Sequence, residues 1–282
     1  MFTKILDGKI IASPILKEIK KIIVNRQQQG IRAPVLAVIL VGDNPASAIY
    51  VKNKQLVCKQ VGIISKFFHI PDDTTQTQLL NLINKLNLNN YIDGILVQLP
   101  LPNTIDYKII LSAINPQKDV DGFHPQNMGL LAQGNPLIAS CTSLAIMHIL
   151  STTKTYLPGK LALVIGASNI VGKPTALSLL NKGCTVTICD RNVIDIKSVI
   201  NKADILVSAV GQPCLVKGNW IKQGCIIIDV GITKVNDKLV GDVEFEIAKK
   251  RASWITKVPG GVGPMTIAYL MKNTLLAQML RE

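Results

Sequence analysis

The sequence predicts an α/β protein with two domains, each built around a mostly parallel sheet. Two observations support this. Strand and helix signals alternate in two separate series, and 282 residues suit two domains of moderate size. Between the series, residues 116–139 interleave Gly, Pro, Asn and Gln, which marks a candidate inter-domain stretch. A cleft is expected between the two domains.

The first series begins with residues 35–41, an unbroken run of apolar and largely β-branched residues typical of a strand buried on both faces. Gly42-Asp43-Asn44-Pro45 then turns the chain. Strand–helix–strand units of this length imply parallel pairing. The predicted elements that follow are a helix over 46–60 closed by Gly62, a strand over 63–70, a helix over 74–86 and a strand over 92–99.

The second series follows the same alternation after the 116–139 stretch. Its first strand is preceded by Pro158-Gly159, a turn signal. The predicted elements are helices over 142–150, 173–181 and 265–280 and strands over 161–165, 185–189, 205–210 and 225–230.

Composition indicates a folded protein without a membrane span. Hydrophobic residues make up 48% of the chain, enough for a sizeable core. The longest apolar run has seven residues, whereas a spanning helix needs about 20. The first ten residues carry charges where a signal peptide requires an apolar stretch. We therefore expect a soluble, cytoplasmic protein.

Cysteine and histidine usage argues against a metal centre. None of the six cysteines forms a C-x-x-C pair, and the three histidines are scattered, so no metal-ligand spacing occurs. In a chain of this length, six cysteines are more typical of reduced, buried thiols than of a disulfide framework.

The formal net charge of +13 makes nucleic-acid binding the first alternative class. Only five of the 31 basic residues are arginines, although bidentate phosphate and base recognition favours arginine. The lysines are also spread along the chain. A solvated basic surface and attraction of polyanions, such as dinucleotides or acidic-tailed substrates, are the two interpretations of the charge that stay open, and no nucleic-acid or membrane partner is predicted.

The segment 161–174 has the pattern of a dinucleotide loop. An apolar strand leads into Gly166-Ala167-Ser168, and Gly172 opens a helix. Glycines let the backbone approach a pyrophosphate, and the helix start supplies N–H donors and a positive dipole end. The spacing is not G-x-G-x-x-G, so an ordinary strand–helix turn remains an alternative. We predict a Rossmann-like NAD(P)-binding domain over about residues 140–260.

The end of the next strand carries two residues with opposite implications. Asp190 at this position favours NAD, because an acid there usually binds the adenosine ribose. Arg191 favours NADP, because an arginine there holds the 2′-phosphate. NADP is the predicted cofactor, and NAD remains an alternative.

Seven segments, in order and spread over nearly the whole chain, resemble the bifunctional methylenetetrahydrofolate dehydrogenase/methenyltetrahydrofolate cyclohydrolase family. Together they are far more specific than any one of them. The segments are residues 47–54, 93–102, 118–125, 166–174, 229–232, 241–245 and 258–266.

The resemblance implies a role for particular residues. Lys54 is the implied general acid/base, Gln98 orients it, and Asp121 holds the pterin ring. Helical spacing puts Ser47, Tyr50 and Lys54 on one face, where a tyrosine ring can stack on a flat ligand. The further implied substrate-binding residues are Pro259, Gly260 and Gly261, and the cofactor-binding residues are Gly166, Ala167, Ser168, Ile170, Asp190, Arg191, Ile232 and Thr266.

The resemblance further implies the reaction and its setting. Methylenetetrahydrofolate is oxidised with NADP, and water then opens the methenyl product to 10-formyltetrahydrofolate. A folate-binding catalytic domain is expected over about residues 1–120, completed by the C-terminal helix 265–282. A homodimer, a folate substrate that carries a polyglutamate tail, and a place in one-carbon metabolism for purine, methionine and histidine biosynthesis are implied.

Several positions depart from the family pattern. Ala167 stands where the family has arginine, and Asp190-Arg191 replace a His-Ser pair. Ser140, Ser143 and Lys257 replace prolines. A cyclohydrolase with an impaired or NAD-shifted dehydrogenase therefore stays open as an alternative.

Overall fold

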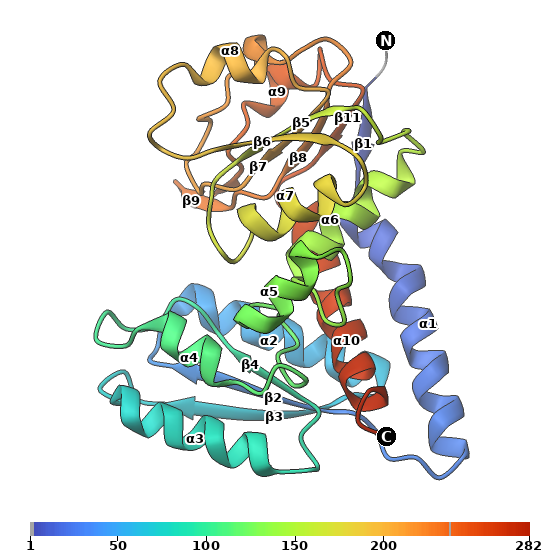
Figure 1. Ribbon diagram of the computed structural model, residues 1–282, viewed down its shortest axis with the longest axis vertical. Helices are drawn as coiled ribbons and strands as arrows, with labels where there is room; N and C mark the ends of the chain where they lie inside the picture. Colours follow the sequence, from blue (N-terminus) through green and yellow to red (C-terminus); the bar gives the residue numbers. More distant parts are fainter. Residues whose placement is uncertain (1–2, 237) are drawn as a thin grey trace. The chain divides into compact units, whose positions relative to one another are not determined.

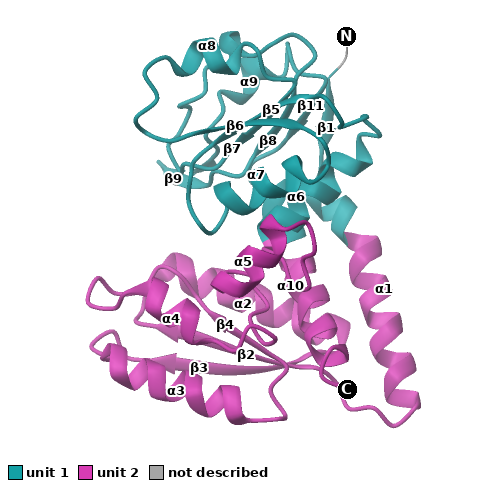
Figure 2. Cartoon of the chain, in the orientation of Figure 1, with its two compact units in different colours: residues 1–12, 142–266 teal, residues 13–141, 267–282 magenta. Residues whose placement is uncertain are grey.

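The computed structural model describes residues 3–236 and 238–282, which form two compact units (Figure 2). Unit 1 takes in the described residues up to Ala12 together with Thr142–Thr266. Unit 2 comprises Ser13–Cys141 and Ile267–Glu282. The segment 116–139, expected between domains, is folded inside unit 2 and carries a helix, because its Pro and Gly residues begin and turn local structure rather than loosen it.

Unit 2 is built on a three-stranded parallel sheet of order β3-β2-β4 (Figure 1). The strands are β2 (Val35–Val41), β3 (Ile64–Ile70) and β4 (Gly94–Val97). All seven residues of β2 are buried, which confirms the predicted central strand. The helices of this unit are α1 (Gly8–Gln28), α2 (Pro45–Val61), α3 (Gln76–Leu88), α4 (Tyr107–Ala113), α5 (Pro125–Ala132) and α10 (Val262–Met279). The first residues of α1 and α10 belong to unit 1.

Local sequence signals fix the ends of the helices next to β2. The Asn44 side chain accepts a hydrogen bond from Ser47 N–H at 3.0 Å, and Pro45 occupies the first turn of α2. Gly62 closes α2 in the left-handed region at φ 90°. Thr75 and Gln78 form a capping box at the start of α3.

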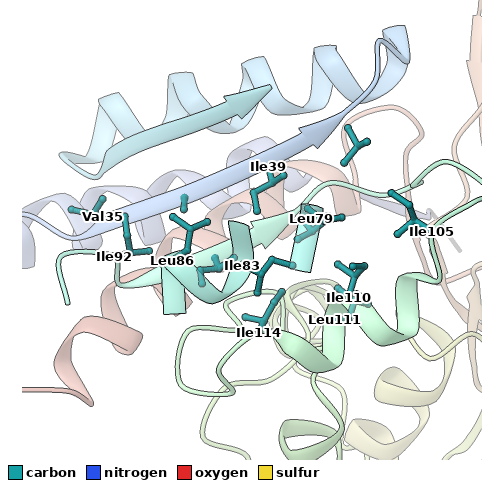
Figure 3. Packing of buried hydrophobic residues seen from close by; sticks show 14 residues of the cluster. Val35, Ile39, Leu79, Ile83, Leu86, Ile92, Ile105, Ile110, Leu111 and Ile114 are labelled. Carbon is teal, nitrogen blue, oxygen red and sulfur yellow. The ribbon is translucent and has the colours of Figure 1, made fainter. Parts of the chain in front are cut away.

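One face of this sheet packs on α3 and α4 to form an apolar core (Figure 3). Alternate residues of β2 point to this face, as the two-residue period of a strand requires. The even-numbered residues of β2 are also buried, so both faces of the sheet are covered. The central residues of the core are Val35, Ile39, Leu79, Ile83, Leu86, Ile92, Ile95, Ile110 and Ile114.

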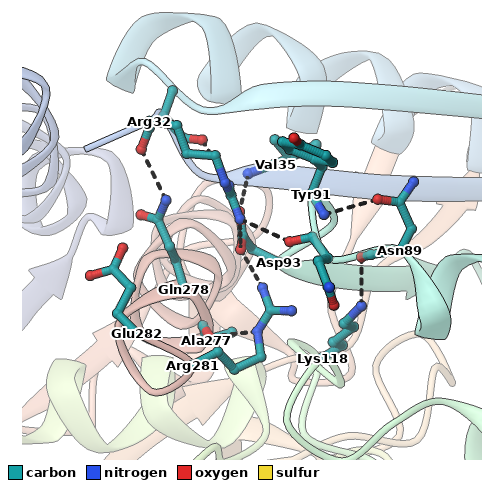
Figure 4. Close-up of polar contacts among 12 residues, drawn as sticks. Arg32, Val35, Asn89, Tyr91, Asp93, Lys118, Ala277, Gln278, Arg281 and Glu282 are labelled. Atoms are coloured by element: carbon teal, nitrogen blue, oxygen red, sulfur yellow. Dashed lines mark hydrogen bonds and ion pairs between the residues drawn. The ribbon is translucent and has the colours of Figure 1, made fainter. Parts of the chain in front are cut away.

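A buried carboxylate ties the end of the chain to this sheet (Figure 4). Asp93 has no exposed surface and accepts two hydrogen bonds from Arg32, at 2.5 and 2.8 Å, and one from Arg281. It also accepts the N–H of Val35 at 2.7 Å. Two guanidinium groups on one buried carboxylate give a charge-assisted anchor for α10.

Unit 1 contains a six-stranded parallel sheet of order β1-β11-β8-β7-β5-β6 (Figure 1). The strands are β1 (Lys4–Leu6), β5 (Leu161–Ile165), β6 (Thr185–Cys189), β7 (Ile205–Ser208), β8 (Ile226–Asp229) and β11 (Trp254–Thr256). A two-stranded antiparallel pair, β9 (Thr233–Val235) and β10 (Lys238–Val240), follows β8. The helices are α6 (Cys141–Thr152), α7 (Gly172–Leu180), α8 (Ile196–Ile200), α9 (Phe245–Ala248) and the 3₁₀ turn Gly218–Trp220.

The two-domain α/β class with mainly parallel sheets is confirmed. The structure adds elements that the sequence pattern did not predict, above all α1 and the edge strand β1, which pairs with β11. It also starts α10 three residues earlier than predicted. All six cysteines are free, and five of them are buried. Among the described residues, no helix is both long and apolar enough to cross a membrane.

Candidate active site

The carboxyl ends of β2 and β4 form the topological switch point of unit 2. The chain leaves β2 toward β3 on one side, and β4 lies on the other side. Ligands in open parallel sheets bind at such a point. Gln98 follows β4 directly, and its N–H donates to Ile39 O of β2 at 2.8 Å. The helix that follows β2 is α2, which carries Tyr50 and Lys54.

Lys54 and Gln98 are paired across this edge. The ammonium of Lys54 donates to Gln98 Oε1 at 2.9 Å. Gln98 Nε2 donates to Leu99 O at 2.7 Å, so the amide presents its oxygen to the lysine. Both side chains are only partly buried, so the amine is oriented and reachable at the same time. The predicted Lys54–Gln98 pair is therefore present in the structure.

Lys118 and Asp119 stabilise the turn that carries Asp121. The buried Lys118 donates to Leu86 O, Asn87 O and Asn89 O at 2.7–3.1 Å and thereby neutralises the carboxyl end of α3. Burial lowers the pKa of Lys118 to about 8.

Asp119 holds the chain that follows the turn. Its carboxylate accepts His124 N–H at 2.7 Å and the Asn127 side chain at 2.9 Å, which fixes the start of α5. Among the described residues, by contrast, none donates a hydrogen bond to the Asp121 carboxylate. Lys118 and Asp119 are structural, and Asp121 is left available for a ligand.

The side chain of Asp121 is half-buried, in surroundings that disfavour its charged form. Burial raises its pKa to about 6, the nearby Lys54 charge lowers it, and the Asp119 charge raises it. Strongly perturbed acids without structural partners are typical of functional sites. The Lys54 ammonium is thus the positive charge that favours the ionised form of Asp121.

Gly122 and Asn273 set the backbone position of Asp121. Gly122 has φ +75°, and a Cβ there would overlap the backbone of Ala139. Asn273 of α10, itself buried, donates to Val120 O and Ala139 O at 2.9 Å each. Sequence reasoning missed Lys118, Asp119 and Asn273 as structural supports, since only their buried contacts distinguish them from surface polar residues.

Tyr50 lies one helical turn before Lys54 and is 37% exposed. Partial burial raises the pKa of its hydroxyl. An exposed ring beside the amine suits stacking on a flat ligand. Ser47, in contrast, is buried at the start of α2, where its N–H is capped by Asn44.

Unit 1 has the features of a dinucleotide site at its own switch point, between β5 and β7. Gly166 has φ +110°, and a Cβ there would overlap Ala209 O, whereas a Cβ at Gly172 would overlap Gly166 O. Ser168 Oγ accepts the N–H groups of Val171 and Gly172 at 3.1 and 3.4 Å. The tight turn that opens α7 brings the backbones of Gly166 and Gly172 together, as in a pyrophosphate loop, while Ser168 itself engages the N–H groups of Val171 and Gly172.

The two charged residues at the end of β6 differ in their hydrogen bonds. The Asp190 carboxylate accepts the backbone N–H and the side-chain amide of Asn192, both at 2.9 Å. It is thus engaged by its own turn. Arg191 is exposed, and no hydrogen bond or ion pair is recorded for it among the described residues. Gly166 N–H donates to Cys189 O at 2.8 Å, so this turn adjoins the glycine loop.

The remaining predicted residues of unit 1 lie in loops and in the first turns of α10. Pro259, Gly260 and Gly261 follow β11, and Gly260 O accepts Gly8 N–H at 2.9 Å. The Lys257 ammonium, in place of the family's proline, pairs with Asp7 at 2.5 Å and helps to hold this loop. The other predicted cofactor residues are the half-buried Ala167 and Ile170 in the glycine loop, the exposed Ile232 after β8 and the half-buried Thr266 in α10.

Unit 1 carries a dinucleotide-type glycine turn. Unit 2 carries an amine–amide pair and an acid without a donor among the described residues. These features are typical of two-domain α/β enzymes that use a nicotinamide cofactor. Within that class, the chain belongs to the tetrahydrofolate dehydrogenase/cyclohydrolase family. Residues 6–121 match the family's catalytic domain, and residues 140–282 match its NAD(P)-binding domain. The family predicted from the seven sequence segments is confirmed.

Similar proteins agree along the full length. The chain is 53% identical to the bifunctional protein FolD of Methylobacillus flagellatus, over 100% of this chain and 98% of that protein. It resembles the crystal structure of the bifunctional enzyme FolD from Campylobacter jejuni, with 45% identity, a TM-score of 0.96 and coverage of 99% and 100%. It also resembles the Trypanosoma brucei FolD structure, a complex with NADP and an inhibitor, with 38% identity, a TM-score of 0.97 and coverage of 100% and 99%.

Proposed function

We propose that this protein oxidises 5,10-methylenetetrahydrofolate to the 5,10-methenyl form with NADP and then hydrolyses that product to 10-formyltetrahydrofolate. The observation that carries the proposal is the Lys54–Gln98 hydrogen bond at the switch point of unit 2, with Asp121 nearby. Unit 2 is the folate-binding catalytic domain, completed by the C-terminal helix, and unit 1 binds the dinucleotide.

The catalytic roles follow from the chemistry of each group. Asp121 accepts hydrogen bonds from the paired N–H groups of the pterin ring, which a carboxylate does in bidentate fashion. Tyr50 stacks on the ring and, with Asp121, sets its orientation relative to Lys54. When bound, the nicotinamide accepts the hydride from the bridging carbon of the folate.

Hydrolysis is assigned to Lys54. After the ammonium has released one proton to solvent, the neutral amine takes a proton from the water that attacks the methenyl carbon and returns it to the ring nitrogen as that C–N bond breaks. The new hydroxyl loses its proton to solvent and becomes the formyl oxygen. Gln98 Oε1, which accepts from Lys54, keeps the amine in one position through both transfers.

The choice of NADP rests on the end of β6. Asp190, the residue that would favour a free ribose hydroxyl, is engaged by Asn192. Arg191 is free to meet a 2′-phosphate with a charge-assisted contact, which offsets the absence of arginine at Ala167. The NADP complex of the Trypanosoma brucei relative supports the same choice.

The setting is proposed on the family relationship. The protein acts in the cytoplasm as a homodimer on folates that include polyglutamylated forms. Its product serves one-carbon transfer in purine, methionine and histidine biosynthesis. The formal charge of +13 favours anionic substrates of this kind.

Ala167 supports a second candidate, a cyclohydrolase with a weakened or NAD-shifted dehydrogenase. One experiment separates the two. The methenyl product and the reduced nicotinamide are followed together by absorbance, with NADP and NAD in parallel reactions. The proposal expects both signals with NADP, followed by decay of the methenyl band. Methenyl decay without any nicotinamide reduction would favour the second candidate, and the absence of both would refute the proposal.

A further inference from the structure

Two buried acids in unit 1 have no part in the reaction described above. Asp229, at the end of β8, is 4% exposed, and Asp242, after β10, has no exposed surface. They belong to the short segments Asp229-Val230-Gly231 and Gly241-Asp242-Val243, which are joined by a hydrogen bond from Asp242 N–H to the Asp229 carboxylate. Burying two carboxylates side by side is costly unless their oxygens are well supplied with donors.

Asp242 holds the loop that leaves β7. Its carboxylate accepts Val210 N–H at 2.8 Å, Gln212 N–H at 2.9 Å and the Ser208 hydroxyl at 3.1 Å. One side chain therefore fixes every second residue of the 208–212 loop.

Asp229 holds the complementary segment. Its carboxylate accepts Gly231 N–H at 3.1 Å and the N–H groups of Asp242 and Val243 at 3.0 Å each. It therefore fixes the backbone from which the Asp242 side chain projects.

The glycines of the two segments complete the arrangement. A Cβ at Gly231 would overlap the Asp242 carboxylate, and a Cβ at Gly241 would overlap the Asp229 carboxylate. Each acid thus occupies the space left by the other segment's glycine. This reciprocal packing leaves a single relative position for the two segments.

The loop that Asp242 holds borders the dinucleotide turn. Ala209 N–H donates to Ile165 O at 2.8 Å, and Ala209 O lies where a Cβ of Gly166 would be. Because β5 and β7 flank the switch point, a shift of the 208–212 loop changes the space beside the glycine turn.

We propose that Asp242, held in place by Asp229, is a positioning residue that sets the affinity of this enzyme for its dinucleotide. The inference rests on the proposed dehydrogenase function. The side chain acts through the 208–212 backbone and has no contact with the reacting atoms.

The protonation of Asp229 predicts a pH dependence of dinucleotide affinity that packing alone would not produce. Burial raises the pKa of Asp229 to about 7, and the charge of Asp242 adds to the rise, against the backbone N–H groups that lower it. Asp242 is the charged group that acts on the Asp229 carboxylate, which otherwise faces backbone N–H groups; Thr256 contacts only the backbone of Asp229, accepting its N–H at 2.7 Å. Protonation of Asp229 below about pH 7 weakens its hold on the Asp242 segment, so dinucleotide affinity falls as the pH drops from 8 to 6.

The test measures the dissociation constants of NADP and NAD directly, by titration calorimetry, for the full-length wild type and three variants. Asp242→Asn is expected to weaken binding at least tenfold, because one end of its amide offers a donor to a backbone N–H. Asp229→Asn is expected to remove the dependence of NAD affinity on pH between 6 and 8; NAD is used because it lacks the 2′-phosphate of NADP, which titrates in this range. Asp204→Asn is the matched control at the opposite, amino end of β7, where the acid accepts Leu161 N–H and pairs with Lys222; it should stay within twofold.

The outcomes separate the possible failures. A wild type that binds neither dinucleotide would refute the dehydrogenase function itself. A wild type that binds, with a folded Asp242→Asn variant within twofold of it, would overturn only the positioning role, as would a pH dependence of NAD affinity that survives in Asp229→Asn. If Asp242→Asn does not fold, Ser208→Ala removes one donor to the same carboxylate, and a weakening of two- to fivefold is expected; unchanged affinity there would overturn the proposal.

Discussion

Replacement of Asp121 by asparagine should abolish activity and at the same time stabilise the protein. The Asp121 carboxylate is half-buried, and none of the described residues donates a hydrogen bond to it, so its charge is poorly compensated when no folate is bound. Asparagine has nearly the same size and carries no charge. It cannot accept two hydrogen bonds from paired N–H groups of a pterin without turning its own NH₂ toward one of them.

The size of the stabilisation follows from the pKa. The folded pKa of about 6 lies above the ordinary value of 3.8 for an aspartate, so the folded state holds its proton more tightly than the unfolded chain. The resulting penalty is absent below pH 3.8, grows as the pH rises, and is complete above pH 6. A shift of about two units corresponds to roughly 3 kcal/mol at pH 7.5, with about half of that at pH 5.

Urea unfolding at pH 7.5 and pH 5 measures this effect. Asp121→Asn should raise the free energy of unfolding by about 2–3 kcal/mol at the higher pH and by less at the lower pH. Asp106→Asn is the control, since Asp106 caps the exposed start of α4 and asparagine caps equally well. A variant that is inactive but less stable than the wild type at pH 7.5 would refute the reasoning, because it would show that Asp121 has a structural role.

Three further substitutions test other parts of the structure. Gly122→Ala should cost more than about 2 kcal/mol in urea unfolding, because φ is +75° and the new methyl overlaps Ala139; an unchanged unfolding midpoint would contradict it. Asp93→Asn should cost about 2–4 kcal/mol by the same assay, because the two partly exposed guanidinium groups lose their buried counter-charge; a loss below 1 kcal/mol would contradict that role. Arg191→Ala should raise the KM for NADP about tenfold and leave the KM for NAD within twofold; equal effects on both cofactors would remove Arg191 from the 2′-phosphate site.

The parts of the fold set by local pattern could be predicted from the sequence. The bounds of β2 and β5 were predicted to the residue, since an apolar run flanked by turn residues suffices to define a buried parallel strand. The pairing of β1 with β11 could not be predicted, because it joins residues about 250 positions apart through a three-residue strand. The start of α10 was placed three residues too late, because glycine in its first turn weakens the helical pattern there.

The candidate site shows the same division. Lys54, Gln98 and Asp121 were identified through resemblance, and spacing alone supports only a shared helix face for Tyr50 and Lys54. The distinction between Asp119 and Asp121 needed the structure, since both belong to one turn and only hydrogen bonding separates a structural acid from an available one. The reciprocal packing of Asp229 and Asp242 is equally invisible in sequence, because each acid is matched with the other segment's glycine.

The most direct test of the account is the fate of the methenyl intermediate in Lys54→Met. Stopped-flow absorbance after mixing with methenyltetrahydrofolate should show hydrolysis slowed at least a hundredfold, while NADP binding measured separately is retained. Lys59→Met, on the exposed side of the same helix, should hydrolyse at the wild-type rate. Hydrolysis by Lys54→Met at the rate of Lys59→Met would contradict the assignment of proton transfer to this amine.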